Sequence, residues 1–392
     1  MAQDFVDWGL AEATAGALGK AGPRVTFDEA ADVVGQLREL ALAAAEHVQA
    51  YTGLSPAGPP APVRVVDRRA WAAANIDGLR AVVSPLLVRA SGGRKPGPFA
   101  EAVGSRVTGV QAGTVLAYLS GRVLGQYEVF ASDPGQLLLV APNIVDVERR
   151  LQADPRDFRL WVCLHEVTHR TQFTAVPWLR AHFLSEVAAF VDAGGTTEEV
   201  EARVRRAMRE LVDTIRNPES RHSMIDLVQT PAQRIVLDRI TALMTLLEGH
   251  AEFVMDGVGP QVVPSVAEIR ARFNRRREGG NSVERLIRRL LGVDAKLRQY
   301  AEGRTFVQEV VSRVGMSAFN RVWESPLTLP LTHELAQPLA WIERVGAMPL
   351  PTATSVGVSG PPDRDEYDEE TVRDRAAEMD EAGQPGADET PD

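Results

Sequence analysis

Apolar residues recur every three to four positions along most of the chain, from about residue 27 to residue 346. This spacing is typical of amphipathic helices, and the glycine and proline residues between the apolar segments are expected in loops. The pattern therefore predicts a mainly α fold. The helices expected are Glu29–Tyr51, Arg69–Val88, Thr196–Arg216, Val266–Arg277, Ser282–Leu291 and a later set from Lys296 through Trp341.

Two short extended runs interrupt the helical pattern. Val63–Val66 and Leu137–Val140 are rich in valine and leucine and are flanked by proline, glycine and aspartate, the residues that commonly bound strands. We expect these runs to form a small β-sheet beside the helices.

A strong helix start occurs at Asp154. Aspartate is a favoured N-cap residue, Pro155 suits the first helical position, and Asp157 places a negative charge in the first turn. The helix should continue to about Phe173 and end before Pro177.

This helix contains His165-Glu166-Val167-Thr168-His169, the HExxH pattern. Histidines four residues apart project from one face of a helix and can hold one metal ion, while the glutamate between them can reach a water molecule on that ion. At about 100° per residue, Phe158 and Val162 share the face of the two histidines. The opposite face is apolar too, which predicts a central helix that is buried all round.

The metal needs a third protein ligand. The metzincin pattern requires a glycine three residues and a histidine six residues after the second histidine, and Gln172 and Ala175 exclude it. The remaining common solution is a glutamate from a second helix. The best candidate helix begins with the capping box Thr230-Pro231-Ala232-Gln233 and ends near Gly257.

Glu248 lies within the apolar stripe of that second helix. A carboxylate on a buried apolar face is unfavourable unless a cation or a metal compensates it, so we expect Glu248 to bind the metal, with a salt bridge to a buried arginine as the alternative. Glu252, one turn later, could orient a ligating histidine or could itself be the ligand. His250 points to the opposite side and is not expected to bind. The stripe consists of Leu237, Ile240, Met244, Leu247, Ala251 and Met255.

Two resemblances accompany these motifs. The segment Glu248-Gly249-His250-Ala251-Glu252-Phe253 resembles the Glu-Gly-x-Ala-x-aromatic segment of gluzincins, the metallopeptidase group that includes thermolysin-like enzymes and aminopeptidases. From about Val25 to Val345 the chain also resembles a family of actinobacterial zincin-like metallopeptidases described as associated with deazaflavin cofactor biosynthesis. The residues that carry this second resemblance are Leu164–Arg170, Leu246–Asp256 and the stretch from Lys296-Leu-Arg-Gln-Tyr300 to Trp323-Glu-Ser-Pro-Leu.

The resemblances imply a fold and a set of roles. They imply a zincin-like helical domain with a small sheet, in which Glu248 is the third zinc ligand and Glu252 supports the site. We place this domain at residues 25–346, after an N-terminal segment 1–24 and before an acidic tail 347–392 that is too poor in apolar residues to fold.

Two features depart from well-understood gluzincins. Glu248 follows His169 by 79 residues, which is more than in thermolysin-like enzymes, so an inserted helical segment is expected between the two motif helices. No residue matches the histidine or tyrosine that commonly stabilises the oxyanion, and His222, Tyr300 and His333 are the candidates.

Imidazole and carboxylate ligands suit Zn²⁺. The expected reaction is hydrolysis of an amide bond in a peptide or a small molecule, with Glu166 as the general base. The alternative is a catalytically inactive zincin-fold protein that binds metal as a scaffold or partner module.

Charge and cysteine content restrict the remaining classes of function and the cellular location. Thirteen of the 53 acidic residues lie in Asp363–Asp392, and the rest of the chain has as many basic as acidic residues, which argues against a nucleic-acid surface. The arginine-rich region Arg270–Arg289 has only Phe273 for base stacking. The chain has a single cysteine, Cys163, which is expected in the core. This single cysteine, the acidic start of the chain and the lack of a long apolar run predict a cytoplasmic protein without membrane attachment.

Overall fold

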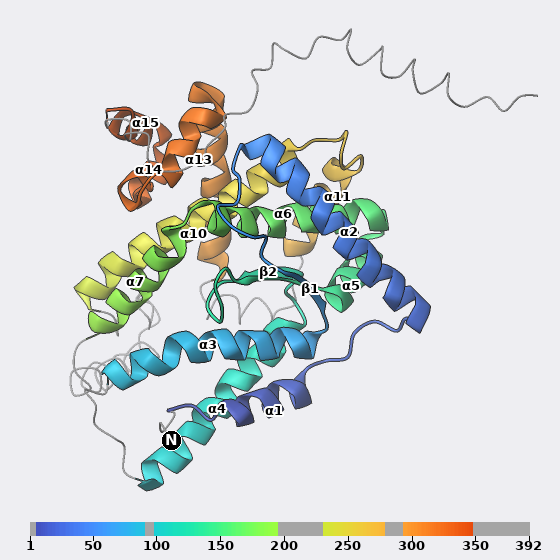
Figure 1. Ribbon diagram of the computed structural model, residues 1–392, viewed down its shortest axis with the longest axis vertical. Helices are drawn as coiled ribbons and strands as arrows, with labels where there is room; N and C mark the ends of the chain where they lie inside the picture. Colours follow the sequence, from blue (N-terminus) through green and yellow to red (C-terminus); the bar gives the residue numbers. More distant parts are fainter. Residues whose placement is uncertain (1–4, 91–97, 195–229, 279–292, 348–392) are drawn as a thin grey trace, which may run out of the picture.

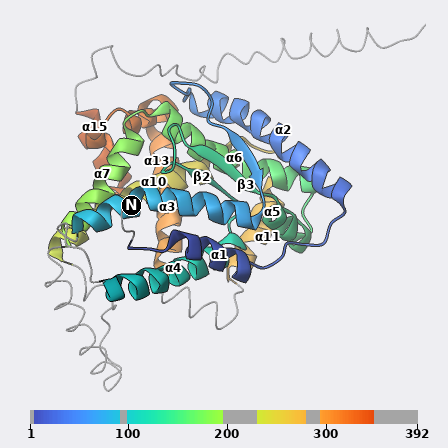
Figure 2. The same cartoon turned by 60° about the horizontal axis from the view of Figure 1, so that its bottom comes forward.

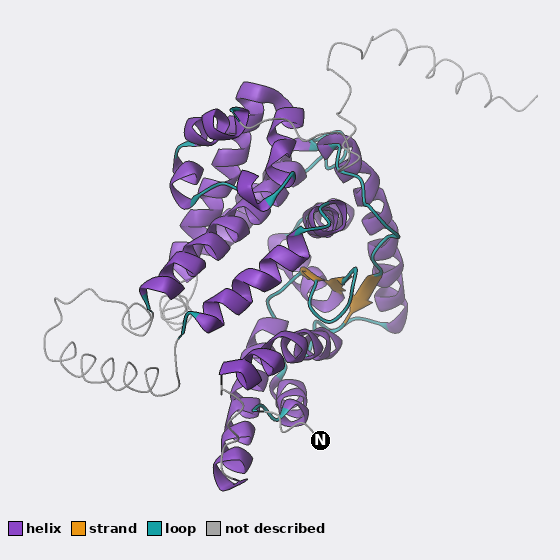
Figure 3. Ribbon diagram, turned by 60° about the vertical axis from the view of Figure 1, so that its left-hand side comes forward, coloured by secondary structure: helices purple, strands orange, loops and turns teal. Residues whose placement is uncertain are grey.

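The computed structural model describes residues 5–90, 98–194, 230–278 and 293–347. Helices form most of this part of the chain, and one small sheet lies among them (Figures 1 and 3). The mainly α fold with a small β-sheet is therefore confirmed. The expected helices Thr196–Arg216 and Ser282–Leu291 and the acidic tail from residue 348 onward lie outside the described residues.

Most of the helices expected from periodicity are present with bounds close to the predicted ones. Those that were not singled out in the sequence are α1, α4, α5 and α7. The helices are α1 Trp8–Leu18, α2 Phe27–Thr52, α3 Arg68–Ala90, α4 Pro98–Ser120, α5 Ala141–Leu151, α6 Pro155–Ala175, α7 Leu179–Asp192, α10 Pro231–Gly257, α11 Val266–Glu278, α13 Val293–Phe319, α14 Thr332–Ala336 and α15 Pro338–Gly346, with 3₁₀ turns η1 Asn320–Trp323 and η2 Pro326–Thr328.

The sheet has three strands in the order β1-β3-β2, formed by β1 Val63–Val66, β2 Gly125–Glu128 and β3 Gln136–Val140. β1 and β3 run parallel and β2 pairs with β3 antiparallel. The two predicted extended runs are thus the parallel pair. The edge strand β2 was not predicted, because Gly-Gln-Tyr-Glu has no run of β-branched residues.

The central strand β3 is buried on both faces, which explains its continuous apolar sequence. Leu137 and Leu139 pack into the cluster formed with α2, α5 and α6, whereas Leu138 and Val140 pack into the cluster formed with α1, α3 and α4. The sheet therefore separates these two groups of helices (Figure 2). α6 lies on one side of it, and β2 borders that helix along the edge.

A third core cluster holds α10 in place. Leu243, Leu246 and Leu247 of α10 pack with residues of α7, α13, α14 and α15. The α10–α13 crossing is close enough that a Cβ atom on Gly249 would lie 2.1 Å from the carbonyl carbon of Gly303. Glycine at both positions therefore lets the two backbones touch, and this contact fixes the rotation of α10 next to Glu248. No helix in the described ranges combines the length and the apolar content needed to cross a bilayer.

Candidate metal centre

The helix that carries HExxH begins and ends almost where its sequence predicts. The Asp154 side chain accepts a hydrogen bond from the Asp157 amide, Pro155 occupies the first position, and the helix ends at Ala175. Nearly all its residues are buried, as expected for a central helix. His165 and His169 lie on its least buried face, where 22% and 14% of their side-chain surface remains exposed. A solvent molecule or a substrate can therefore reach the two imidazoles.

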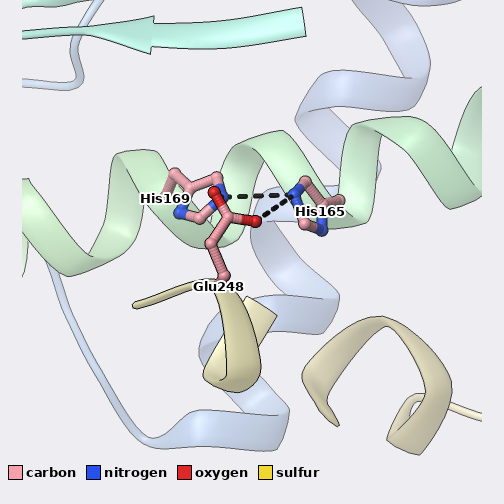
Figure 4. Close-up of side chains that lie close together, drawn as sticks. All are labelled: His165, His169 and Glu248. Carbon is pink, nitrogen blue, oxygen red and sulfur yellow. Dashed lines mark hydrogen bonds and ion pairs between the residues drawn. The ribbon is translucent and has the colours of Figure 1, made fainter. Parts of the chain in front are cut away.

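The second predicted helix brings Glu248 to the same place. Thr230 and Gln233 form the reciprocal capping box at its start, with Pro231 at the first position, and the helix ends at Gly257. Figure 4 shows the Glu248 carboxylate directed at the two imidazoles from the opposite helix. The distances from Nε2 to the carboxylate oxygens are 3.6 Å for His165 and 3.7 Å for His169, and 3.2 Å separates the two Nε2 atoms.

These three donor atoms fit a tetrahedral metal ion. Zinc bonds of about 2.0–2.2 Å place neighbouring ligand atoms roughly 3.3–3.6 Å apart. The distance between the two Nε2 atoms, and the distance from each Nε2 to its nearer Glu248 oxygen (Oε2 for His165 and Oε1 for His169), are close to these values. His165, His169 and Glu248 form a group of possible metal ligands in the described residues, with all ligand atoms within 4.8 Å of one another. Three ligands leave a fourth position for water or substrate, as in catalytic zinc sites.

The pKa values of the two histidines shift in opposite directions, although the neighbouring carboxylates raise both. Burial by itself would lower the pKa of His165, but Glu248, followed by Glu166 and Glu252, raises it above its ordinary value. Burial lowers the pKa of His169, and Glu248 only partly opposes this. Without metal, His165 therefore binds a proton more readily than His169, and a proton on Nε2 of His165 would compete with a metal ion for that lone pair.

Glu166 occupies a separate, drier position beside the edge strand. The pKa of its carboxyl group is raised to about 7, chiefly by burial and also by the Glu248 carboxylate, while His165 opposes the shift. A Cβ atom on Gly125 of β2 would lie 2.6 Å from Cγ of Glu166 and 2.7 Å from its Cδ. Gly125 thus makes room for Glu166 between α6 and the sheet.

Comparison with known proteins places this arrangement in a family. The sequence model of the family described as zincin-like metallopeptidase matches residues 6–342 of the chain. The chain belongs to this family. A solved structure from Chloroflexus aurantiacus, described as a candidate hydrolase with a novel fold, is 31% identical and has a TM-score of 0.65. The similarity covers 88% of this chain and 100% of that one. No curated protein matches the sequence.

Membership of the zincin-like family implies a bound metal, typically zinc. Glu252 does not join the ligand cluster of this family member. Its carboxylate lies 3.6 Å from Nη1 of Arg270, and its charge also acts on His165. Glu252 is therefore near the ligands without belonging to their cluster.

Sequence reasoning missed the side chain that orients His169 in this zincin-like site. Oε1 of Gln172 accepts a hydrogen bond from Nδ1 of His169 at 2.9 Å, which leaves Nε2 of that ring free to bind metal. The Gln172 amide donates to the Leu247 carbonyl at 2.9 Å and to Nδ1 of His250 at 3.0 Å. His250, which was expected to point away from the ligands, thus links the two motif helices through Gln172. The signal available in the sequence was a polar side chain three residues after His169, a spacing at which two helical side chains can meet.

The other residues singled out in the sequence have simpler surroundings. Cys163 is fully buried in the core, as expected. Among the oxyanion candidates, His333 is exposed on α14. His222 lies outside the described residues, as does the side chain of Tyr300. In the described part of the arginine-rich region, Arg270 pairs with Asp256 and Arg272 with Glu268.

Proposed function

We propose that this zincin-like protein is a zinc-dependent hydrolase that cleaves an amide bond in a peptide or small molecule. Nε2 of His165, Nε2 of His169 and the Glu248 carboxylate hold the metal in the gluzincin arrangement. The observation that carries the proposal is the meeting of these donor atoms, from two separate helices, at distances of 3.2, 3.6 and 3.7 Å.

The remaining groups of the site suit proton transfer. When bound, zinc supplies Lewis acidity that lowers the pKa of water towards about 7 and polarises a carbonyl group. Glu166 is the general base: its carboxylate accepts the proton of the attacking water and donates it to the leaving amine. A pKa of about 7 suits both transfers, because such a carboxylate can accept and release a proton near neutral pH.

The position of Glu166 supports an enzyme over a metal-binding scaffold. A structural zinc site is closed by four protein ligands, whereas the described residues offer three and leave the histidine face partly exposed. A buried carboxylate with a raised pKa next to the ligands is also unfavourable for folding. Such a residue is expected where chemistry requires it.

The test is the isosteric variant Glu166→Gln. Turnover of a mixed peptide pool, followed by mass spectrometry, should fall by about 100- to 10,000-fold, while the zinc content should match that of the wild type. Glu268→Gln, on an exposed glutamate of α11, is the matched control and should retain full turnover. Wild-type turnover in a Glu166→Gln preparation that still holds zinc would rule out this base.

A further inference from the structure

Two arginines of α6 are equally buried but differ in their partners. Arg159 is 7% exposed and Arg170 is 8% exposed. The Arg159 guanidinium donates to both carboxylate oxygens of Glu148, at 2.9 and 2.6 Å, and to Gln36 at 2.7 Å. Arg159 and Glu148 therefore form a buried ion pair in which each charge is compensated by the other.

Arg170 has no such partner. Among the residues that the structure describes, none forms a hydrogen bond or an ion pair with its guanidinium. The hydroxyl of Tyr127 is the titratable group that acts on Arg170, but this hydroxyl already donates to the Pro134 carbonyl. A buried cation without a counter-charge lowers the stability of a protein. An anion bound beside Arg170 would supply the missing counter-charge.

Arg170 lies next to the proposed catalytic groups. It directly follows His169 and comes one helical turn after Glu166 on α6. At about 100° per residue, Arg170 is rotated only about 40° from Glu166 around the helix axis. Both side chains therefore project from the flank of α6 that faces β2, towards Gly125 and Tyr127.

A pocket adjoins Arg170 on the same flank. Phe173 and Thr174, the surface neighbours of Arg170 three and four residues further along α6, both line a pocket of about 420 Å³. This volume lies within the range of about 300–1,000 Å³ that is common for small-ligand sites. The rest of the wall combines small apolar side chains and prolines with one cationic and one acidic side chain; it consists of Ala57, Gly58, Pro59, Asp133, Pro134, Pro177, Arg180 and Ala181.

We propose that Arg170 binds a free carboxylate of the substrate, whose apolar body occupies this pocket. The guanidinium offers parallel N–H donors that match a carboxylate in two hydrogen bonds. Because Arg170 directly follows the proposed metal ligand His169 on α6, a carboxylate bound there belongs to a residue close to the cleaved bond. This inference rests on the proposed hydrolase function and specifies its substrate: a peptide or acylated amino acid cleaved near a free C-terminal carboxylate.

The first experiment compares pairs of short peptides that are identical except for a C-terminal carboxylate or a C-terminal amide. The wild type should cleave the acid with a kcat/KM about 10- to 100-fold higher than the amide. Arg170→Met should lose this preference by lowering kcat/KM for the acid alone. Arg313→Met, on an exposed arginine of α13, should keep it. No preference in the wild type, or equal losses for both peptides in Arg170→Met, would overturn the proposal.

Two further measurements keep the result independent of folding and of hydrolysis. Arg170→Met should fold, since no described acidic group loses its partner, and Arg170→Lys, which retains the charge but not the paired donors, should also lose most of the preference. Binding of N-acetylphenylalanine and of its amide is measured by thermal unfolding. The acid should raise the Tm of the wild type by about 2–4 °C, and neither compound should do so in Arg170→Met.

The two readouts separate this inference from the proposed function. If the Tm shift depends on Arg170 but the protein cleaves no peptide, the carboxylate site would be supported and the hydrolase function would be ruled out. Cleavage without an Arg170-dependent preference, together with equal Tm shifts in both proteins, would retain the hydrolase and reject the carboxylate site. Direct binding of the acid to the metal would appear as a shift that persists in Arg170→Met.

Discussion

The two halves of α6 use buried polar residues in opposite ways. In the N-terminal half, Asp157 accepts hydrogen bonds from the amide and hydroxyl of Ser265, and Arg159 pairs with Glu148. In the C-terminal half, Glu166 has a raised pKa, and Arg170 has no counter-ion within the described chain. Asp157 and Arg159 are thus compensated within the fold and stabilise it. Glu166 and Arg170 have no ion-pair partner among the described residues, which is the expected cost of a functional site.

The largest effect that sharpens this comparison concerns the two arginines. Arg159→Met should destabilise the protein by about 3–5 kcal/mol, because Glu148 would remain buried without its partner. Arg170→Met should be neutral or stabilising, because it removes an uncompensated charge. Denaturant unfolding of the two variants, with a common slope against denaturant concentration, measures both values. Similar losses in the two variants would erase the distinction between the halves of the helix.

A second effect concerns the pH dependence of the metal-free protein. The carboxyl group of Glu166 has a pKa of about 7 in the folded state against a model value of 4.5, so the folded state binds the proton more tightly. The contribution of the protonated Glu166 carboxyl group to the free energy of unfolding is therefore fully present below a pH of about 4.5. It is lost as the pH rises to about 7. Metal-free Glu166→Gln should gain on the order of 3 kcal/mol relative to metal-free wild type at pH 8, and little at pH 5.

Denaturant unfolding at the two pH values measures this difference. Glu268→Gln provides the control, since its carboxylate is exposed and pairs only with Arg272 among the described residues. A constant difference between Glu166→Gln and wild type across this pH range would contradict the raised pKa of Glu166.

The smallest effect concerns the orientation of His169. Gln172→Leu removes the acceptor for Nδ1 of His169 and the link to His250. Zinc affinity, measured by competition with a chromophoric chelator, should fall by about 10- to 100-fold.

Gln172→Glu retains an acceptor for the same ring nitrogen but loses the amide donor to the Leu247 carbonyl and to His250, so its zinc affinity should lie between those of Gln172→Leu and the wild type. Gln49→Leu, at an exposed glutamine of α2, controls for the loss of an amide. Unchanged affinity in Gln172→Leu would show that His169 needs no support from this side chain.

Local sequence signals predicted the two helices that carry the site and the side chains that face it. The N-caps Asp154 and Thr230, each followed by proline, determine where α6 and α10 begin, and the 3.6-residue period then determines which side chains share a face. This was sufficient to pair the HExxH histidines with Glu248, although 79 residues separate Glu248 from His169.

The missing features depend on contacts between distant segments. Gly125 matters because β2 passes next to Glu166, and the Gly249–Gly303 contact exists because two helices cross there. Gln172 and Arg170 stand out only when the partners around them are known. Periodicity identifies a buried polar residue, but it cannot show whether the fold supplies a partner for it.

The metal content of the purified protein tests the central claim most directly. Elemental analysis is applied to the wild type, His165→Ala, Glu248→Ala and a control, His47→Ala, whose histidine lies on α2 away from the ligand cluster. We expect close to one zinc per chain in the wild type and in the control, and loss of zinc in both ligand variants. A wild type without metal, or a Glu248→Ala protein with full zinc occupancy, would contradict the proposed site.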